Sequence, residues 1–313
     1  MDENIKKPSV RFKIVDTIYI IMMILPLACG IVLDILTTPP SSGVNIAGAR
    51  IYFEFPLSDN VPRFFHLIIS EAQVNSALVM ITILFVFLYL THGLKQKIEL
   101  KRQHLAEIIV EKVDALVGEN MGSDFSAFPP FIIAIMALSA FSSLVSLLGL
   151  YPATSDMNVV AGWAILVFMI ITYYKLKCGM LYYLSGFTKP VFILAPINFI
   201  SEFATPISMA FRHYGNVMSG GVISVLLSTF LAFLSSLVLG WAGDYISAIP
   251  IFQVGLPAIF SVYFDIFSGC LQAFIFAMLT MLNISGAFDA EEYYKRKKKK
   301  LEKKKLKNTN GGN

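Results

Sequence analysis

Uncharged stretches separated by short charged segments are the main pattern along this chain of 313 residues. A helix needs about 20 apolar residues to cross the hydrocarbon core of a bilayer, which is ~30 Å thick. The pattern therefore predicts an all-α, polytopic membrane protein with about six membrane helices. The uncharged stretches are residues 17–33, 76–91, 125–155, 157–174, 214–243, 245–264 and 266–288.

The first apolar segment runs from Ile18 to Leu36 and follows a basic N-terminus, as a secretory signal peptide would. It is longer than the apolar core of a signal peptide, which has about 7–15 residues. No clean small-x-small cleavage site precedes Asp34. We therefore expect a membrane helix that is retained rather than cleaved.

Lysine and arginine residues concentrate in alternate connections between the predicted helices, and cytoplasmic loops carry such an excess. The alternation predicts that both termini are cytoplasmic and that the protein lies in a bacterial plasma membrane. The basic segments are 6–13, 95–102, 175–189 and 295–307, whereas 39–75 has only Arg50 and Arg63, and 151–156 has no basic residue.

Two charged segments lie outside the predicted spans. Residues 100–117 carry apolar positions at helical spacing with acidic and basic residues between them, which predicts an amphipathic helix on the inner membrane surface or against a partner. The Lys-rich tail, 289–313, is expected to be disordered and to contact anionic lipid. Binding of nucleic acid is the disfavoured alternative for this tail.

Composition supports a membrane protein and corrects the meaning of the net charge. Hydrophobic residues make up 56% of the chain and charged residues 15%, with a mean hydropathy of +0.68. These values exclude a disordered chain, a coiled coil and a typical soluble enzyme. The net charge of +4 misleads, because residues 291–313 hold 10 of the 25 basic residues and the remaining 290 residues have a net charge of −3.

No cofactor, metal or nucleotide site is indicated. The three cysteines, Cys29, Cys178 and Cys270, lie far apart in or beside apolar runs and match no metal-binding pattern. We read them as small buried hydrophobic residues. The chain also lacks a glycine-rich phosphate loop of the G-x-x-x-x-G-K type.

The last third of the chain combines a long apolar segment with isolated ionisable residues. A continuous helix over 191–239 would be about 73 Å long, so this segment either breaks into two spans or lies steeply tilted. Pro206, Gly215 and the pair Gly220–Gly221 would permit a bend.

Arg212 is the most informative of these residues, because arginine keeps its charge at any physiological pH. No acid lies three or four positions away, and Glu202 is ten positions away. One interpretation is a buried ion pair with Asp265 or Asp244. The other is a carboxylate on another subunit, which would release its proton near Arg212 because a fixed cation lowers its pKa.

Motifs around Arg212 resemble those of subunit a of the F-type ATP synthase. The resemblance rests on Pro206 to Asn216, with the sequence PISMAFRHYGN, and on Leu271 to Thr280, with the sequence LQAFIFAMLT. It extends to SEAQVNS, which begins at Ser70, and to LLGLYPATSDMN, which begins at Leu147. The resemblance covers about residues 70–290.

The resemblance implies roles for individual residues. Arg212 matches the stator arginine that faces the ion-carrying carboxylates of the rotating c-ring, and Gln272 matches the glutamine that lies near that arginine on the last helix. Asn216 matches an asparagine near the ion path. Ser208 matches a small polar position on the path to the cytoplasmic side.

The family's outer half-channel uses a pair of positions on the two long helices, which read Gly221 and Asp265 here. Asp265 is therefore the candidate relay acid. Glu202 is a candidate for the inner half-channel, with a helix-end acid in the headgroup region as the alternative. His213 and Tyr214 replace two usually apolar residues, and we expect His213 to have a packing or hydrogen-bonding role.

The implied fold has an extra N-terminal helix and outer loop in residues 1–75, a subunit-a-like domain in 76–288 with a surface helix near 100–117, and the tail 289–313. Two long tilted helices, near 190–240 and 250–288, would form a hairpin against the c-ring.

The implied function is ion conduction through two half-channels that carry H⁺ or Na⁺ to and from the c-ring carboxylates and so drive rotation. The chain would not be an enzyme by itself, and its partners would be the c-ring, the peripheral-stalk subunit b and membrane lipid. The alternative is a secondary transporter in which Arg212 binds an anionic substrate. Such folds usually show internal repeats, and we find no convincing self-similarity between residues 17–150 and 151–288.

Overall fold

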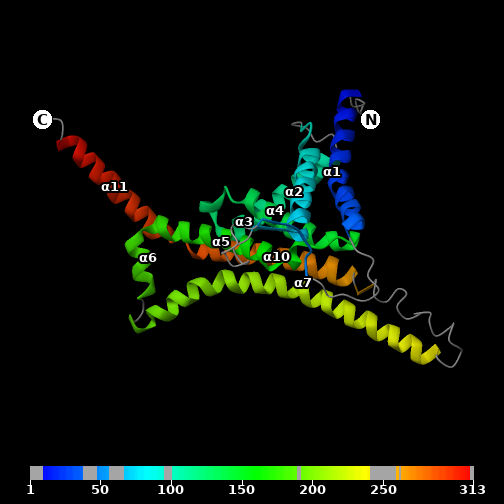
Figure 1. Ribbon diagram of the computed structural model, residues 1–313. Coiled ribbons are helices and arrows are strands. Elements are labelled where there is room, and N and C mark those ends of the chain that lie inside the picture. The colour runs from blue at the N-terminus through cyan, green and yellow to red at the C-terminus, as the bar shows by residue number, and fades with distance from the viewer. Residues whose placement is uncertain are drawn as a thin grey trace.

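The computed structural model describes residues 10–37, 48–55, 67–94, 101–188, 192–239, 259–260 and 262–310. Six helices in these ranges are long and apolar enough to cross a membrane, which confirms the predicted all-α, multi-pass membrane fold. Figure 1 shows the arrangement of the helices. The elements are α1 Val10–Thr37, β1 Ile51–Phe55, β2 Leu67–Ser70, α2 Glu71–Thr91, α3 Lys101–Met121, α4 Pro129–Leu144, α5 Met157–Cys178, α6 Met180–Phe187, α7 Ala195–Leu239, α10 Gly269–Gly286 and α11 Ala290–Asn310, with a π-helix η8 at Tyr263–Ser268 and short 3₁₀ turns between them.

Successive connections between the helices lie at alternate ends of the bundle, as the distribution of basic residues predicts. At one end, Ser70 donates to a carboxylate oxygen of Asp156 at 3.2 Å, and the Asn75 amide donates to the Tyr151 carbonyl. At the other end, Arg102 pairs with Asp16, and the hydroxyl of Tyr294 donates to Asp124. The two sets of connections are thus separated by the membrane-spanning helices.

A short antiparallel hairpin, β1–β2, joins α1 to α2. The sequence pattern did not predict these two strands. Its register pairs Ile51 with Ser70 and Phe55 with Leu67, with a bulge between Ile51 and Phe53. The β-branched and aromatic residues of both strands suit a pleated surface. The hairpin leads directly into α2, whose first residue, Glu71, is buried.

The main core lies where α3, α4, α5 and α10 meet. The predicted surface helix is α3, and its C-terminal apolar residues pack within the chain, whereas Leu105, Ile108 and Val110 stay exposed. The packed residues are Val113, Val117 and Met121, which are buried together with Ile132 of α4 and Ile284 of α10. The polar face of α3 remains exposed, as its amphipathic pattern requires.

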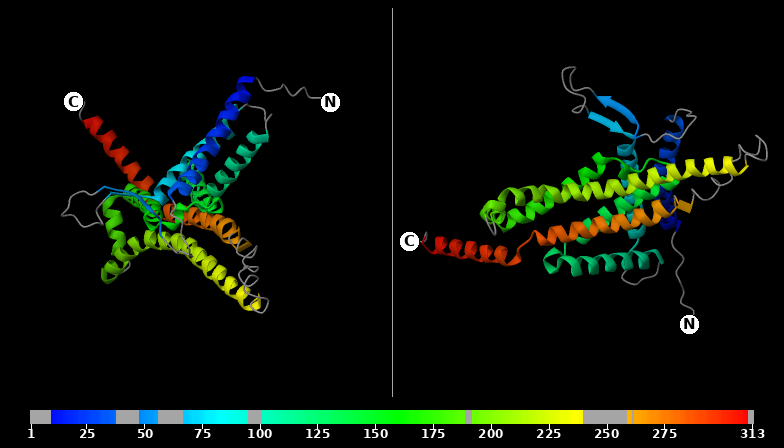
Figure 2. Two further views of the ribbon diagram at one scale, coloured as in Figure 1. Left: turned by 45° about the vertical axis from the view of Figure 1, so that its right-hand side comes forward. Right: turned by 90° about the horizontal axis from the view of Figure 1, so that it is seen from below.

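The long apolar segment forms one helix, α7, of 45 residues with Pro206 inside it. Such a helix is about 67 Å long, more than twice the ~30 Å of hydrocarbon that it must cross. Figure 1 shows α7 running across the direction of α1 and α2, with α10 beside it in all three views of Figures 1 and 2. Of the two alternatives for this segment, the structure therefore shows one continuous, tilted helix rather than two separate spans.

The second long helix was expected to begin near residue 250. Residues 250–258 lie outside the described ranges, and the described part consists of η8 followed by α10. The C-terminal residues differ from the disordered tail that we expected. They form α11, which projects away from the bundle in Figure 1. An i to i+4 ion pair between Glu292 and Arg296, at 2.7 Å, supports its first turns.

Candidate functional site

The rotation of α7 about its axis is fixed by three buried residues, Met209, Ala210 and His213. The His213 ring is fully buried, with its edge or face against Trp163 and Phe276 at centroid distances of 5.8 and 5.4 Å. Its Nε2 lies 3.2 Å from the hydroxyl of Ser139 on α4. The expected packing and hydrogen-bonding role of His213 is therefore confirmed.

Because His213 faces inward, the preceding residue, Arg212, faces outward on α7. Arg212 is exposed and has no ion-pair or hydrogen-bond partner among the described residues. Asp244, one of the two acids considered as an internal partner, lies outside those residues. The backbone of the other, Asp265, lies in η8, and its side chain is outside the description.

The exposed face that carries Arg212 is otherwise apolar or small. Its members recur every three or four positions and form a stripe along α7. They are Ser208, Phe211, Arg212, Gly215, Met218 and Ser219. Small residues beside a cation that has no partner in the described part of the chain leave space for another helix to approach closely.

Two of the other predicted residues lie at, or one turn beyond, the contact between α7 and η8. The Asn216 side chain donates a hydrogen bond of 2.8 Å to the Ser268 hydroxyl. Gln272, one turn beyond Ser268, is buried in α10 with 5% of its surface exposed. Gly220 makes this contact close, because a Cβ there would lie 3.3 Å from the Phe264 ring, whereas a Cβ on Gly221 would meet nothing within 4 Å.

A cavity of about 530 Å³ adjoins this contact, at the end of the bundle that carries the β1–β2 hairpin. Its walls combine α7, the start of α5 and the chain around β1 and β2. A further cavity of about 20 Å³ shares Val217 and Gly221 with it and reaches Asn216 and Ser268. The main lining residues are Ala49, Tyr151, Asp156, Tyr214, Gly221 and Val225.

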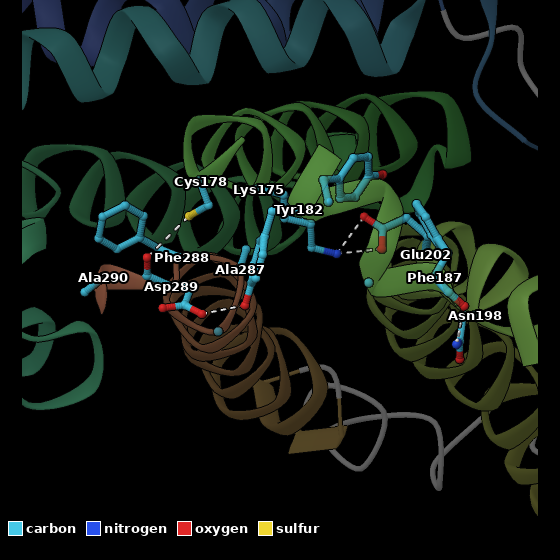
Figure 3. A pocket seen from close by; sticks show the side chains of 13 residues that line it. Lys175, Cys178, Tyr182, Phe187, Asn198, Glu202, Ala287, Phe288, Asp289 and Ala290 are labelled. Atoms are coloured by element: carbon cyan, nitrogen blue, oxygen red, sulfur yellow. Dashed lines mark hydrogen bonds and ion pairs between the residues drawn. The ribbon is translucent and has the colours of Figure 1, made fainter. Parts of the chain in front are cut away.

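A second cavity, of about 610 Å³, opens at the opposite end of the bundle and is drawn in Figure 3. Glu202 of α7 projects into it and forms an ion pair with Lys175 of α5, with N–O distances of 2.7 and 2.5 Å. A deeper cavity of about 230 Å³ is lined by the same pair together with Thr205 and Asn283. The ion pair thus lies at the boundary between the two cavities.

The outer rim of the larger cavity carries a fixed negative charge at Asp289. The hydroxyl of Tyr182 and the backbone N–H of Glu292 donate hydrogen bonds to its carboxylate, at 2.6 and 3.1 Å. These bonds lower the pKa of Asp289 below its ordinary value because they favour the charged form. Asp289 therefore places a negative charge at the rim of this cavity at neutral pH.

Sequence reasoning missed the partners of several predicted residues. Lys175 appears in the sequence only as a topology signal, yet it pairs with Glu202, 27 positions later. Ser268 carries no sequence signal of its own, although it binds Asn216. Glu202 is thus a cavity-lining acid with a cationic partner, an arrangement that fits both the inner half-channel and a helix-end acid in the headgroup region.

Comparison with known proteins places the chain in a family. The family model described as ATP synthase A chain matches residues 74–285, more than half of the chain. A protein of Trichlorobacter lovleyi named ATP synthase subunit a is 27% identical over 248 residues, covering 76% of this chain and 96% of the relative. A Propionigenium modestum protein named ATP synthase subunit a, sodium ion specific, is 26% identical over 283 residues, covering 82% and 89% of the two chains. The chain described here belongs to the ATP synthase subunit a family.

Proposed function

We propose that this chain is the ion-conducting stator subunit of an F-type ATP synthase, with two half-channels that meet at Arg212. One observation carries the proposal: Arg212 is exposed without a partner in the described residues, and it lies on α7 between cavities that open at opposite ends of the bundle. Along α7, Glu202 precedes Arg212 by about 15 Å and Gly221 follows it by about 14 Å, at 1.5 Å per residue.

The outer half-channel runs through the cavity beside Tyr151 and Asp156 to Gly221 and Asn216. An ion leaves it to neutralise a carboxylate of the c-ring, with Asp265 of η8 as the relay acid. A π-helix offsets the helical register and is frequent at functional sites. Gln272, next to this helix on α10, contributes a polar group near the arginine.

The inner half-channel runs from the stripe position Ser208 past Glu202 to the cavity at Asp289. Arg212 separates the two half-channels. Its fixed charge favours the ionised carboxylate by ~4 kcal/mol at 4 Å for an effective dielectric constant of about 20, so an arriving c-ring carboxyl gives up its ion. The same charge repels a cation that would pass directly between the half-channels.

The assembly implied by this function includes the c-ring against the Arg212 stripe, subunit b and membrane lipid, in a bacterial plasma membrane with both termini cytoplasmic. The chain supplies no nucleotide site and contributes to ATP synthesis only within the complex. The coupling ion is H⁺ or Na⁺, and the c-ring ligands choose between them.

Purification in mild detergent tests this proposal. We expect the chain to be isolated together with a ring of small two-helix subunits. A stable monomer that binds an anionic solute through Arg212, measured by isothermal calorimetry, would contradict the proposal and support a secondary transporter.

The ion pair between Lys175 and Glu202 gives a second test. Lys175→Met leaves Glu202, whose side chain is only 11% exposed, without its cationic partner. Lys175 favours the ionised form of the carboxylate beside it, so its removal alters a group on the proposed inner path and we expect ion-driven ATP synthesis to fall several-fold.

The double variant Lys175→Met/Glu202→Gln should stay at least as impaired as the single variant, because the Glu202 carboxylate that lines the proposed inner path is then absent as well. Lys177→Met is the control, since Lys177 lies over the rings of Tyr174 and Tyr293 and has no carboxylate partner among the described residues. If Lys175→Met left the rate of ATP synthesis unchanged, Lys175 would have no role in the inner half-channel.

A further inference from the structure

One wall of the cavity in the outer half-channel is formed by residues that precede the part of the chain matched by the family model. Gly48, Ala49 and Ile51, at the start of the hairpin, and Ile68 of β2 line it, and all four precede residue 74, where the match begins. The facing wall is α7, through Tyr214 to Val225. Removing the hairpin from this arrangement would leave the cavity open along the side opposite α7.

Arg50 fastens this wall to the helices by contacts of both its side chain and its main chain. Its guanidinium donates two hydrogen bonds of 2.9 Å to the Glu71 carboxylate at the start of α2 and also pairs with Asp34 in α1. The Arg50 carbonyl accepts a hydrogen bond of 2.8 Å from the Glu71 N–H. Two-point binding of a carboxylate by arginine fixes orientation as well as distance.

The carboxylate that holds Arg50 is itself fixed. Glu71 is 4% exposed, and its neighbour Ser70 donates to Asp156, which lines the same cavity. Residues 49 and 51 flank Arg50 directly, so the clamp sets the position of the cavity wall on both sides of the arginine. Arg50, Asp34 and Glu71 do not line the cavity themselves, so the clamp acts on the wall through residues 49 and 51 beside Arg50.

We infer that residues 48–51 together with Ile68, held in place by Arg50, form the outer wall of the ion entrance, and that Arg50 is a positioning residue for ion uptake. This inference rests on the proposed function. Ions then enter between the hairpin and α7, beside the polar residues Tyr151, Ser155 and Asp156. The N-terminal helix α1 serves the same wall by supplying Asp34 to the clamp.

Charge placed on the wall tests the inference. Cys178 is buried as expected, whereas Cys29 and Cys270 are exposed. The variant is therefore Ala49→Cys in the complete complex, with Cys29 and Cys270 replaced by serine, and the probe is a membrane-impermeant methanethiosulfonate that carries a positive charge. After modification from the outer side we expect ion-driven ATP synthesis to fall about tenfold relative to the same sample before modification, because a cation in a cleft repels incoming ions.

Phe53→Cys is the matched control. Phe53 is on β1, is 63% exposed and does not line the cavity, so the same modification should leave ATP synthesis unchanged. Equal inhibition of both variants, or of neither, would overturn the inference. Loss of the c-ring from the purified complex would instead contradict the proposed function, which keeps the two failures distinguishable.

Arg50→Ala adds a test of positioning. We expect the outer ion concentration for half-maximal ATP synthesis to rise several-fold while the maximal rate changes less, and Arg50→Lys to restore part of the shift because it keeps the charge but loses the two-point contact. A fall in maximal rate alone, with an unchanged half-maximal concentration, would assign Arg50 a purely structural role.

Discussion

Replacing Arg212 by alanine is expected to abolish ATP-driven ion pumping while the subunit stays folded and assembled. Among the described residues this exposed side chain makes no ion pair or hydrogen bond whose loss would disturb the fold. The proposed mechanism depends on it, because without the cation a c-ring carboxyl keeps its ion when it reaches the stator. Pumping into inverted vesicles, followed with a fluorescent pH or sodium indicator, should fall to the level of vesicles without ATP.

Two controls separate the role of Arg212 from a general effect of charge. Arg212→Lys keeps a cation but lacks the planar guanidinium, and it should restore little of the activity. Arg296→Ala, which removes an arginine from α11 outside the membrane, should pump at the normal rate. Pumping that survives Arg212→Ala in a complex containing the c-ring would show that this residue is not the stator arginine.

Gly269→Val is the second change with a large expected effect, and it acts on assembly. A Cβ on Gly269 would lie 2.7 Å from the Cβ of Ser143, so α10 and α4 could not keep their present contact. Overpacking of this kind costs about 1–3 kcal/mol, or more where backbones meet. We expect little assembled complex in the membrane, measured by immunoblot and native gel electrophoresis.

Gly162→Val makes the same substitution at an exposed position of α5, where a Cβ would meet nothing within 4 Å. It should assemble normally. Because both variants place valine in a helix, a difference in assembly between them could not come from the low helix propensity of valine. If Gly269→Val assembled as well as Gly162→Val, the close packing of α10 on α4 would not be needed for this fold.

The membrane helices could be predicted from the sequence because each depends on a local property. An uncharged stretch long enough to cross the bilayer has few alternatives to a helix, since its backbone groups must be paired within the segment. Arg212 could be singled out for a similar reason, because its charge cannot be removed by deprotonation. The motifs around Arg212 and Gln272 then indicated the family that the comparison confirms.

Contacts between distant segments could not be predicted in the same way. His213 and Ser139 are 74 positions apart, and no periodicity relates them. The hairpin β1–β2 is too short to show an alternating pattern distinct from that of an apolar helix. The first turns of α11 carry an i to i+4 ion pair between Glu292 and Arg296, a local signal that the run of lysines made hard to recognise.

The length of α7 has a consequence for the direction in which the proposed motor turns. Glu202 and Gly221 are separated by 19 residues, about 28 Å along the axis, and in a leaning helix part of this separation lies in the plane of the membrane. The ring would then receive an ion at one point of its circumference and release it at another. A helix tilted the opposite way would exchange the point of entry and the point of release around the circumference. The direction of tilt of α7 would therefore set the direction in which the ring rotates during synthesis.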